Sequence, residues 1–208
     1  MKPFLFITDF DGTVTAQDFV YQIMYRYQHD KIFSKNKKRG VELLSSVFYE
    51  LRLTQEEFLK EIEYIPMDKT FVPFFEFINK SGGDVLVLSA GAKYYIKKKF
   101  SFEGIKNIEI FANDLVFKNN HFRFLTNEDK RFFCPVFGID KEKVVASYKE
   151  KYEKIFYAGD SYVDFYAAKL SDFIFAKKNL VRILKMFNLE FFEFENFDDV
   201  RENLINLI

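Results

Sequence analysis

Short apolar runs alternate along this chain with longer stretches in which apolar residues recur every three or four positions. Each run is flanked by polar or turn-forming residues, which is typical of a short buried strand. The predicted strands lie at 4–7, 84–88, 154–158, 173–176 and 191–194. The amphipathic stretches predict helices at 18–59, 71–80 and 197–207. Strands that alternate with helices indicate an α/β fold, in which helices cover both faces of a mainly parallel sheet.

Local signals place the ends of several elements. Thr54 followed by Glu57 is a capping-box pattern, so a helix is expected to begin there and to run to about residue 63. The residues 118–120 separate two strand-like stretches, 108–117 and 121–125, and predict a β-hairpin. Further helices are expected after residue 91, over 141–152 and from about 164 to 170. No internal repeat or low-complexity linker interrupts this series.

The composition restricts the kind of protein. With 208 residues, 49% of them hydrophobic, the chain can bury the core of one domain, or of one domain and a lid. Lys and Arg total 31, as do Asp and Glu, so no net field favours nucleic acid or an anionic membrane as a partner. The 29 phenylalanines are interpreted as core filling. The short apolar start is neither a signal peptide nor a membrane span, and we expect a soluble, cytoplasmic protein.

Several single features have ordinary interpretations. Cys134 is the only cysteine, which excludes an internal disulfide framework and suits a reducing compartment. With no histidine near it in sequence, it is expected to be inert. His29 and His121 are isolated and are interpreted as surface or structural residues. The basic cluster at 35–40 is interpreted as a solvated loop, with the steering of an anionic substrate as the alternative.

Polar residues directly follow three of the predicted strands. Asp9 and Asp11 come after the first strand, in the stretch Asp9-Phe10-Asp11-Gly12-Thr13-Val14-Thr15. The turn Ser89-Ala90-Gly91 follows the second strand, and Asp160 follows the strand at 154–158. Because the carboxyl ends of parallel strands share one edge of a sheet, these residues are expected to meet despite separations of 80 and 71 positions. Carboxylates at the end of a buried strand are costly unless a cation or hydrogen-bond donors compensate.

This set of side chains suits the hydrolysis of a phosphate monoester. One aspartate, Asp9, can accept the phosphoryl group, and a second, Asp11, can protonate the leaving oxygen and later take a proton from water. Asp9 and Asp160, with a backbone carbonyl, form an oxygen ligand set that suits Mg²⁺. The turn at 89–91 leads into a helix N-terminus, which is a seat for phosphate. Lys141 can neutralise the phosphate and the crowded carboxylates.

Each of these residues also has a structural interpretation. Asp9 and Asp11 could cap a strand end, and Ser-Ala-Gly turns also occur for packing reasons. Asp164 could hold a metal-bound water or orient a lysine, and it could equally be the N-cap of the helix that follows. Lys141 could be a solvated lysine, with Lys143 as the alternative phosphate-binding residue.

The segment DFDGTVT at 9–15 resembles the first sequence motif of the haloacid dehalogenase superfamily of phosphatases. Ser89 stands where that family's second motif has its hydroxyl residue, and Lys141 stands at the position of the third-motif lysine. The segment GDSYVD at 159–164 is similar to the fourth motif. The four motifs occur in the family's order, and the resemblance covers about residues 4–195.

The resemblance implies an architecture and a set of roles. It implies a Rossmann-like core formed by 1–15 and 69–208, and a helical cap domain formed by 16–68. A carboxyl group at position 11 implies a phosphatase or phosphomutase, with an aspartyl-phosphate intermediate and Mg²⁺ as cofactor. The implied site comprises catalytic Asp9, Asp11 and Lys141; phosphate-binding Ser89, Ala90, Gly91 and Lys141; metal-binding Asp9, Asp11 and Asp160; and Asp164 and Thr13 in support of these.

Within the superfamily, the chain most resembles the phosphoserine-phosphatase-like group. In that group it is most similar to the methionine-salvage phosphatase that acts on 2-hydroxy-3-keto-5-methylthiopentenyl-1-phosphate. GDSYVD differs from the GDGxND of true phosphoserine phosphatases, and Ser-Ala-Gly replaces Ser-Gly-Gly. The stretches 111–113, 167–172 and 175–177 and the length of the predicted cap favour the methionine-salvage type. We therefore expect a small phosphorylated metabolite as substrate, and a monomer or homodimer.

Other activities stay open. Phosphoserine, pyridoxal phosphate and phosphocholine are alternative substrates. A phosphotransferase or mutase would pass the same aspartyl-phosphate to a hydroxyl group instead of to water. A protein that binds a phosphorylated ligand without turnover is the non-enzymatic alternative, although the complete set of polar positions favours an enzyme.

Overall fold

The structure, a computed structural model, describes residues 2–27 and 38–208. Within these ranges, seven strands form one sheet in the order β4-β3-β2-β1-β5-β6-β7. Neighbouring strands are parallel except β3 and β4, which form the predicted hairpin. The strands are β1 (Lys2–Thr8), β2 (Asp84–Ala92), β3 (Glu109–Lys118), β4 (His121–Leu125), β5 (Tyr152–Gly159), β6 (Phe173–Ala176) and β7 (Phe192–Glu193). The predicted α/β fold with a mainly parallel sheet is confirmed.

Successive residues of each strand point to opposite faces of the sheet and build two hydrophobic clusters. Phe6 of β1 and Phe156 of β5 belong to one cluster. Ile7 and Tyr157, the next residues in sequence, belong to the other. These side chains are fully buried. Burial on both faces explains why the central strands appear in the sequence as continuous apolar runs.

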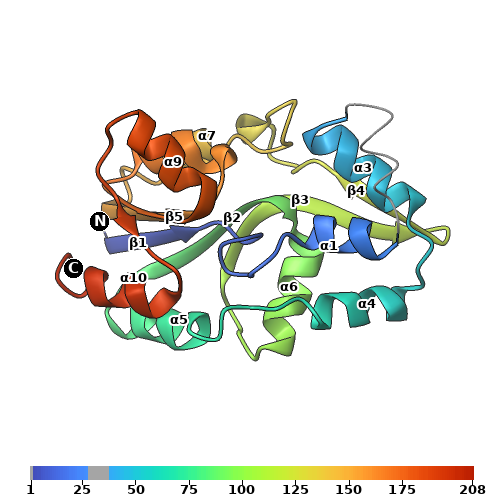
Figure 1. Cartoon of the computed structure of the whole chain (residues 1–208), viewed down its shortest axis with the longest axis horizontal. Helices are drawn as coiled ribbons and strands as arrows, with labels where there is room; N and C mark the ends of the chain where they lie inside the picture. The colour runs from blue at the N-terminus through green and yellow to red at the C-terminus, as the bar shows by residue number, and fades with distance from the viewer. Residues whose placement is uncertain (1, 28–37) are drawn as a thin grey trace.

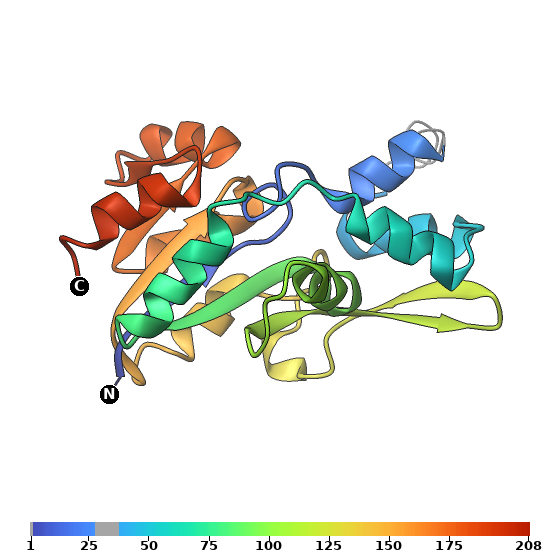
Figure 2. The ribbon, with the colours of Figure 1, turned by 90° about the horizontal axis from the view of Figure 1, so that it is seen from below.

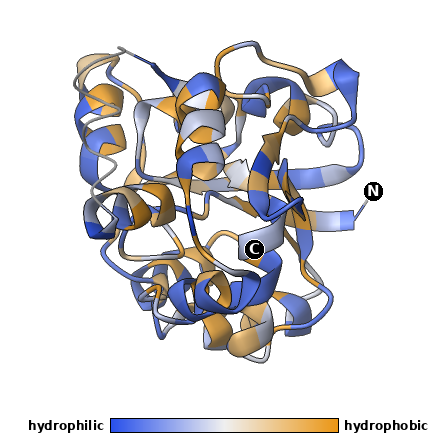
Figure 3. Ribbon diagram, turned by 90° about the vertical axis from the view of Figure 1, so that its right-hand side faces the viewer, coloured by the Kyte–Doolittle hydropathy of each residue, from blue (hydrophilic) through white to orange (hydrophobic). Residues whose placement is uncertain are grey.

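Helices cover both faces of the sheet (Figures 1 and 2). The cluster of Phe6 includes residues of α5 (Phe71–Lys80), α6 (Lys93–Phe102) and α10 (Phe197–Leu204). The cluster of Ile7 includes residues of α7 (Lys141–Ala146), α8 (Phe165–Leu170) and α9 (Lys178–Met186). Figure 3 shows hydrophobic and hydrophilic residues side by side along the helices, as expected when one side of each helix faces the core.

The predicted cap segment, 16–68, contains α1 (Phe19–Arg26), α3 (Gly40–Glu50) and α4 (Gln55–Glu63). The capping box predicted for α4 is present, because Thr54 and Glu57 each accept a hydrogen bond from the backbone of the other. The backbone that enters the segment lies beside the backbone that leaves it, since the N–H of Ala16 donates to the carbonyl of Pro66 at 2.9 Å. Both ends of the segment therefore meet the sheet at one place.

The cap segment packs on the β3–β4 hairpin, beside which it lies in Figure 2. Phe48 of α3 stacks on Phe124 with ring centroids 6.0 Å apart, and Phe58 of α4 contacts Phe122 at 4.2 Å. All four rings belong to the same cluster as Phe6. The hydrophobic core is therefore continuous between this segment and the sheet, and the division of the chain into core and cap stays a prediction.

Three helices differ from the sequence prediction. The helix predicted over 141–152 ends at Ala146, because Tyr152 is the first residue of β5 and pairs with Lys2. Helix α9 is missing from the sequence prediction, although its apolar residues recur at helical spacing. Its buried residues are Leu180, Val181 and Leu184. The last helix is also shorter than predicted and ends at residue 204.

The isolated residues have the following surroundings. Cys134 is a free, half-buried cysteine. His121 stacks on Tyr49 with ring centroids 5.3 Å apart, which fits a structural residue. His29 and most of the basic cluster at 35–40 lie outside the described residues. Within the described ranges, none of the helices combines the length and the apolar character that crossing a membrane requires.

Candidate active site

The site begins where β1 ends. Asp9 follows the strand, and its N–H donates to the carbonyl of Ala158 in β5 at 2.9 Å. Only 6% of Asp9 is exposed. Its Oδ1 accepts a hydrogen bond from Nζ of Lys141 at 2.7 Å. The first residue of α7 thus reaches the end of β1, although the two residues are 132 positions apart.

Lys141 lies between two buried carboxylates. Its Nζ also donates to Oδ1 of Asp164 at 2.7 Å. Burial alone would lower the pKa of Lys141, but the Asp164 and Asp9 carboxylates raise it above its usual range, so the lysine is charged at neutral pH. Lys143, the alternative in the sequence, pairs with Asp140 at 3.3 Å, and 60% of its side chain is exposed. Lys141 is therefore the lysine that the fold brings to Asp9.

Asp164 organises the groups around it. Its Oδ1 accepts from the Tyr157 hydroxyl at 2.8 Å as well as from Lys141, and its Oδ2 accepts from the N–H groups of Asp160 at 3.2 Å and Ser161 at 3.0 Å. Burial would raise the pKa of Asp164, but Lys141 and these donors lower it below its usual value. Asp164 precedes α8 directly, but its side chain makes no capping hydrogen bond to that helix, so the N-cap interpretation is wrong for the side chain. It instead closes a capping box in which Ser161 is the N-cap.

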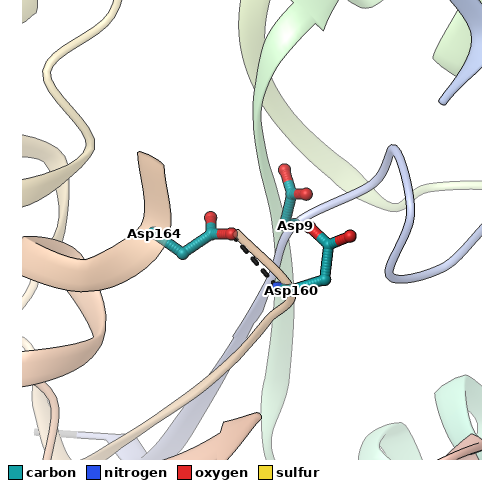
Figure 4. A group of neighbouring side chains, drawn as sticks. All are labelled: Asp9, Asp160 and Asp164. Atoms are coloured by element: carbon teal, nitrogen blue, oxygen red, sulfur yellow. Dashed lines mark hydrogen bonds between the residues drawn. The ribbon is translucent and has the colours of Figure 1, made fainter. Parts of the chain in front are cut away.

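Three carboxylates, one after β1 and two in the stretch after β5, converge at this edge of the sheet (Figure 4). Asp9, Asp160 and Asp164 each offer one oxygen, and these oxygens lie within 4.8 Å of one another. Burial raises the pKa of Asp9 well above its usual value, and the neighbouring Asp164 and Asp160 raise it further against the opposing effect of Lys141. Such a cluster is stabilised by a cation, and carboxylate oxygens are the ligands that Mg²⁺ prefers.

The hydrogen bonds divide these carboxylates into two kinds. Both oxygens of Asp164 are engaged by protein donors. Among the described residues, Asp9 accepts a side-chain hydrogen bond only through Oδ1, from Lys141. Asp160 accepts one only through Oδ2, from Nζ of Lys178 at 3.3 Å. The oxygens left for a metal are therefore on Asp9 and Asp160. The donor set fits the predicted Mg²⁺.

Asp11 has a different environment from the other carboxylates. Its Oδ2 accepts from the hydroxyl of Tyr95 at 2.6 Å, and its Oδ1 accepts from the N–H of Phe19 at 3.0 Å. Burial, together with the charge of Asp18, raises the pKa of Asp11 to about 7. Asp11 is predicted from the sequence as a metal ligand, but its carboxylate lies outside the group of three. We therefore propose its backbone carbonyl, and not its carboxylate, as a ligand of Mg²⁺.

The predicted phosphate-binding turn is a bulge within β2. Ser89 pairs with Ala112 of β3 and Ala92 pairs with Asn113, so Ala90 and Gly91 are inserted between the two pairs. Ser89 is 1% exposed, and its Oγ accepts from the N–H of Gly91 at 2.9 Å. A side chain at position 91 would collide with the Tyr95 hydroxyl, which explains the glycine.

The loop after Asp11 also needs a glycine. Gly12 has φ +86°, and a Cβ there would overlap the carboxylate of Asp160. The loop is tied to α9, because Nζ of Lys178 donates to the carbonyl of Gly12 at 2.6 Å and Nζ of Lys177 donates to that of Thr13 at 2.8 Å. Burial lowers the pKa of Lys177 to about 8. The Thr13 hydroxyl is buried and has no hydrogen-bond partner among the described residues.

A cavity of about 130 Å³ joins these groups. Its walls include the predicted residues Asp9, Asp11, Ser89, Ala90, Gly91 and Lys141. The cap segment contributes Asp18, Val20 and Leu44. The cavity therefore presents the predicted phosphate-binding and nucleophilic residues on the side of the sheet. On the side of the cap segment it presents one carboxylate and two apolar side chains.

Four residues of this region are absent from the site predicted from the sequence. Asp18 has the pattern of an N-cap, which it also is, since its side chain accepts from the N–H of Tyr21. Tyr95 is one of several aromatic residues of an amphipathic helix. Asn113 and Lys178 carry no local signal, because their partners are distant in sequence. For Asp18, the available signal was its closeness in sequence to Asp9, nine positions away.

A sequence model of the haloacid dehalogenase-like hydrolases matches residues 6–169. The chain belongs to the haloacid dehalogenase-like hydrolase family. A solved structure of a phosphoserine phosphatase that carries an analogue of a phospho-aspartyl intermediate superposes on this hydrolase with a TM-score of 0.71. That structure is 20% identical and covers 99% of each chain, which establishes the likeness of the fold.

Two curated relatives of this haloacid dehalogenase-like hydrolase have names that describe an activity. A polyol phosphate phosphatase of Saccharomyces cerevisiae is 28% identical, with 93% of this chain and 89% of the relative covered. A 2-hydroxy-3-keto-5-methylthiopentenyl-1-phosphate phosphatase of Bacillus velezensis is 27% identical, with 98% of this chain and 90% of the relative covered. The family and the phosphatase names confirm the predicted enzyme class, a phosphoric monoester hydrolase.

Proposed function

We propose that the protein hydrolyses a small phosphate monoester with Mg²⁺, and that Asp9 carries the phosphoryl group as an aspartyl-phosphate. One observation carries this proposal: Lys141 holds Oδ1 of the buried Asp9 at 2.7 Å, while Oδ2 has no hydrogen-bond partner among the described residues. A carboxylate that is oriented through one oxygen and lines a cavity is arranged as a nucleophile. The likeness to a phosphoserine phosphatase with a phospho-aspartyl analogue supports it.

In the first step, a carboxylate oxygen of Asp9 attacks the phosphorus of the monoester. The bond between phosphorus and the ester oxygen breaks, and the Asp11 carboxyl group donates its proton to the leaving oxygen. The raised pKa of Asp11, about 7, keeps the protonated form available at neutral pH. Lys141 and the turn at 89–91 stabilise the negative charge of the transferring group.

In the second step, water attacks the phosphorus of the aspartyl-phosphate. Asp11, now ionised, accepts a proton from this water, and the bond between phosphorus and the Asp9 oxygen breaks. Inorganic phosphate leaves, with the carboxylate of Asp9 restored. Asp11 thus acts as acid and then as base. Its hydrogen bonds to Tyr95 and Phe19 hold it apart from the charged cluster around Asp164, which suits a group that gains and loses a proton.

Asp9 and Asp160, with the backbone carbonyl of Asp11, would hold Mg²⁺. When bound, the cation neutralises charge on the phosphoryl group and on the clustered carboxylates. Lys141 and Lys178 balance these carboxylates only in part, because burial and mutual repulsion still raise the pKa values of Asp9 and Asp160. Removal of the cation by EDTA is therefore expected to abolish turnover.

The cavity favours a short substrate. Its volume of about 130 Å³ is below the roughly 300–1,000 Å³ of pockets for drug-sized ligands. Asp18 can accept hydrogen bonds from hydroxyl groups, whereas Val20 and Leu44 can contact carbon atoms. The names of the two relatives describe polyol phosphates and a hydroxylated pentenyl phosphate. We propose a phosphorylated short carbon chain with hydroxyl groups, and the methionine-salvage phosphate is one candidate.

The experiment is a screen for phosphate release. The panel contains sugar-alcohol phosphates, the methionine-salvage intermediate, phosphoserine, pyridoxal phosphate and phosphocholine, with Mg²⁺ and with EDTA as control. Turnover of a hydroxylated short-chain phosphate, lost in EDTA, is the expected result. Transfer to added alcohols in preference to water would indicate a phosphotransferase. No turnover of any ester by the folded protein with Mg²⁺ would contradict the proposed function and favour a binding role.

A further inference from the structure

A fully buried amide connects the two elements that the proposed function uses to bind phosphate. Asn113 is 0% exposed and lies on β3, the strand beside the bulge of β2. Its Nδ2 donates to the carbonyl of Ala90 at 2.8 Å and to the carbonyl of Phe137 at 2.9 Å. Its Oδ1 accepts from the N–H of Asn127 at 3.1 Å. These partners fix the orientation of the amide, because two acceptors face Nδ2 and a donor faces Oδ1.

On one side, Asn113 supports the phosphate-binding turn. The bulge removes Ala90 and Gly91 from the regular pairing of β2 with β3, and backbone groups in a bulge lose their ladder partners. The side chain of Asn113 supplies a donor for the carbonyl of Ala90. With this carbonyl held toward β3, Ser89 and Gly91 keep their places in the cavity wall.

On the other side, Asn113 holds the loop that leads to Lys141. The carbonyl of Phe137 lies four positions before Lys141, and Gly138 follows it with φ +76°. A Cβ at Gly138 would overlap the Asn113 side chain, so the loop lies directly against the amide. One NH₂ group therefore sets the separation between the turn at 89–91 and the start of α7.

We propose that Asn113 is a positioning residue of the phosphate site, which it preforms by joining the turn at 89–91 to the loop before Lys141. This inference rests on the proposed function for the identity of the ligand, phosphate. Asn113 is absent from the residues that line the cavity, so its effect passes through Ala90 and Phe137. A preformed site pays no ordering cost on binding, so loss of the amide weakens affinity for phosphate.

Two variants and one control separate positioning from general stability. Asn113→Asp keeps the size and shape of the side chain but removes Nδ2, so that a carboxylate oxygen faces the carbonyls of Ala90 and Phe137. Asn113→Ala removes the amide altogether. Asn127→Ala is the matched control. It removes the bond from Asn127 Nδ2 to the carbonyl of Ala112 at 2.8 Å and the bond from the N–H of Asp129 to Asn127 Oδ1 at 2.9 Å, and it leaves the Asn127 N–H for Asn113.

The measurement is the Kd of inorganic phosphate by calorimetry, with Mg²⁺ present, and the Kd of Mg²⁺ alone. We expect phosphate affinity to fall roughly ten-fold or more in both Asn113 variants, as for the loss of a buried hydrogen bond, and to change less than about two-fold in Asn127→Ala. Mg²⁺ affinity should stay within about two-fold in all three, because Asn113 does not contact Asp9 or Asp160. Equal phosphate affinity in folded Asn113 variants, even with a lower Tm, would overturn the proposal.

A measurement on the wild-type protein covers the case in which these variants do not fold. The side-chain NH₂ protons of Asn113 are expected to exchange slowly with solvent and to shift in the NMR spectrum when phosphate is added. Rapid exchange, or no shift at saturating phosphate, would overturn the positioning role alone. Failure of the wild-type protein to bind phosphate would instead overturn the proposed function, and with it the role of Asn113.

Discussion

The hydroxyl group of Tyr95 donates a hydrogen bond of 2.6 Å to Oδ2 of Asp11. The other oxygen of the same carboxylate accepts from the N–H of Phe19, the first residue of α1, at 3.0 Å. The proposed acid/base is therefore held between α6, which packs on the sheet, and the first helix of the cap segment. Both hydrogen bonds favour the ionised carboxylate, but burial outweighs them and raises the pKa to about 7.

This relationship predicts how the rate depends on pH. The first step needs protonated Asp11, so kcat/KM for an alkyl phosphate is expected to fall as the pH rises through about 7. The Tyr95 hydroxyl lowers the pKa of Asp11, so Tyr95→Phe should raise it and move this fall to higher pH by about one unit, the equivalent of about 1.4 kcal/mol. An aryl phosphate, whose leaving group needs less protonation, is the control. An unchanged pH profile in Tyr95→Phe would contradict the influence of Tyr95 on Asp11.

Replacement of the two candidate lysines is predicted to lower stability by very different amounts. Lys141→Met leaves two buried carboxylates without their shared cation and is expected to lower the free energy of unfolding by roughly 3–5 kcal/mol, with loss of activity. Lys143→Met removes an exposed pair with Asp140 and should cost less than about 1 kcal/mol, with activity kept. Urea unfolding measures both. Similar losses in the two variants would show that Lys141 is not the cation of the buried cluster.

Alanine substitutions at two glycines with similar φ angles distinguish the effect of backbone strain from the effect of a contact with the proposed metal site. Gly12 and Gly82 have φ +86° and +79°, so alanine at either position should cost about 1–2 kcal/mol through the left-handed backbone alone. A Cβ at Gly12 also overlaps the Asp160 carboxylate, whereas nothing lies within 4 Å of one at Gly82. Mg²⁺ affinity, measured by calorimetry, should therefore fall roughly ten-fold or more in Gly12→Ala and stay unchanged in Gly82→Ala. Equal Mg²⁺ affinity in the two variants would remove Asp160 from the proposed metal site.

Much of the candidate site could be predicted because its residues occur in local sequence patterns. Asp9, Ser89 and Asp160 each follow an apolar strand, and parallel strands bring such ends to one edge. The choice between Lys141 and Lys143 could not be made in this way, because it depends on which side of α7 faces the sheet. The sequence pattern also could not predict where the Asp11 carboxylate points, because its hydrogen bonds to Tyr95 and Phe19 set that direction.

The features that the sequence did not reveal depend on distant contacts. Asn113 donates a hydrogen bond to Ala90, 23 positions earlier, and the turn pattern at 89–91 does not indicate this partner on a neighbouring strand. The lysines at the start of helix α9, which bind the loop after Asp11, look like ordinary solvated residues in the sequence. The fold class follows from alternating strands and helices, whereas these residues gain their roles only once the sheet has formed.

Replacement of the proposed nucleophile should leave the fold intact. Asp9→Asn keeps the shape of a side chain that is 6% exposed, and it removes a buried charge whose pKa burial and the nearby carboxylates already raise. We expect a Tm equal to or above that of the wild type, because less repulsion remains around Asp164 and Asp160. Turnover should be abolished. Activity that persists in folded Asp9→Asn would be incompatible with Asp9 as nucleophile.

The most direct test of the account is the location of the phosphoryl group during turnover. The enzyme is mixed with a radiolabelled substrate and Mg²⁺, quenched in acid within a turnover, and digested for peptide mapping by mass spectrometry. The account predicts that the label resides on Asp9 in the wild type and that Asp9→Asn carries none. A label on Asp11, or on no residue of an enzyme that is turning over substrate, would contradict it.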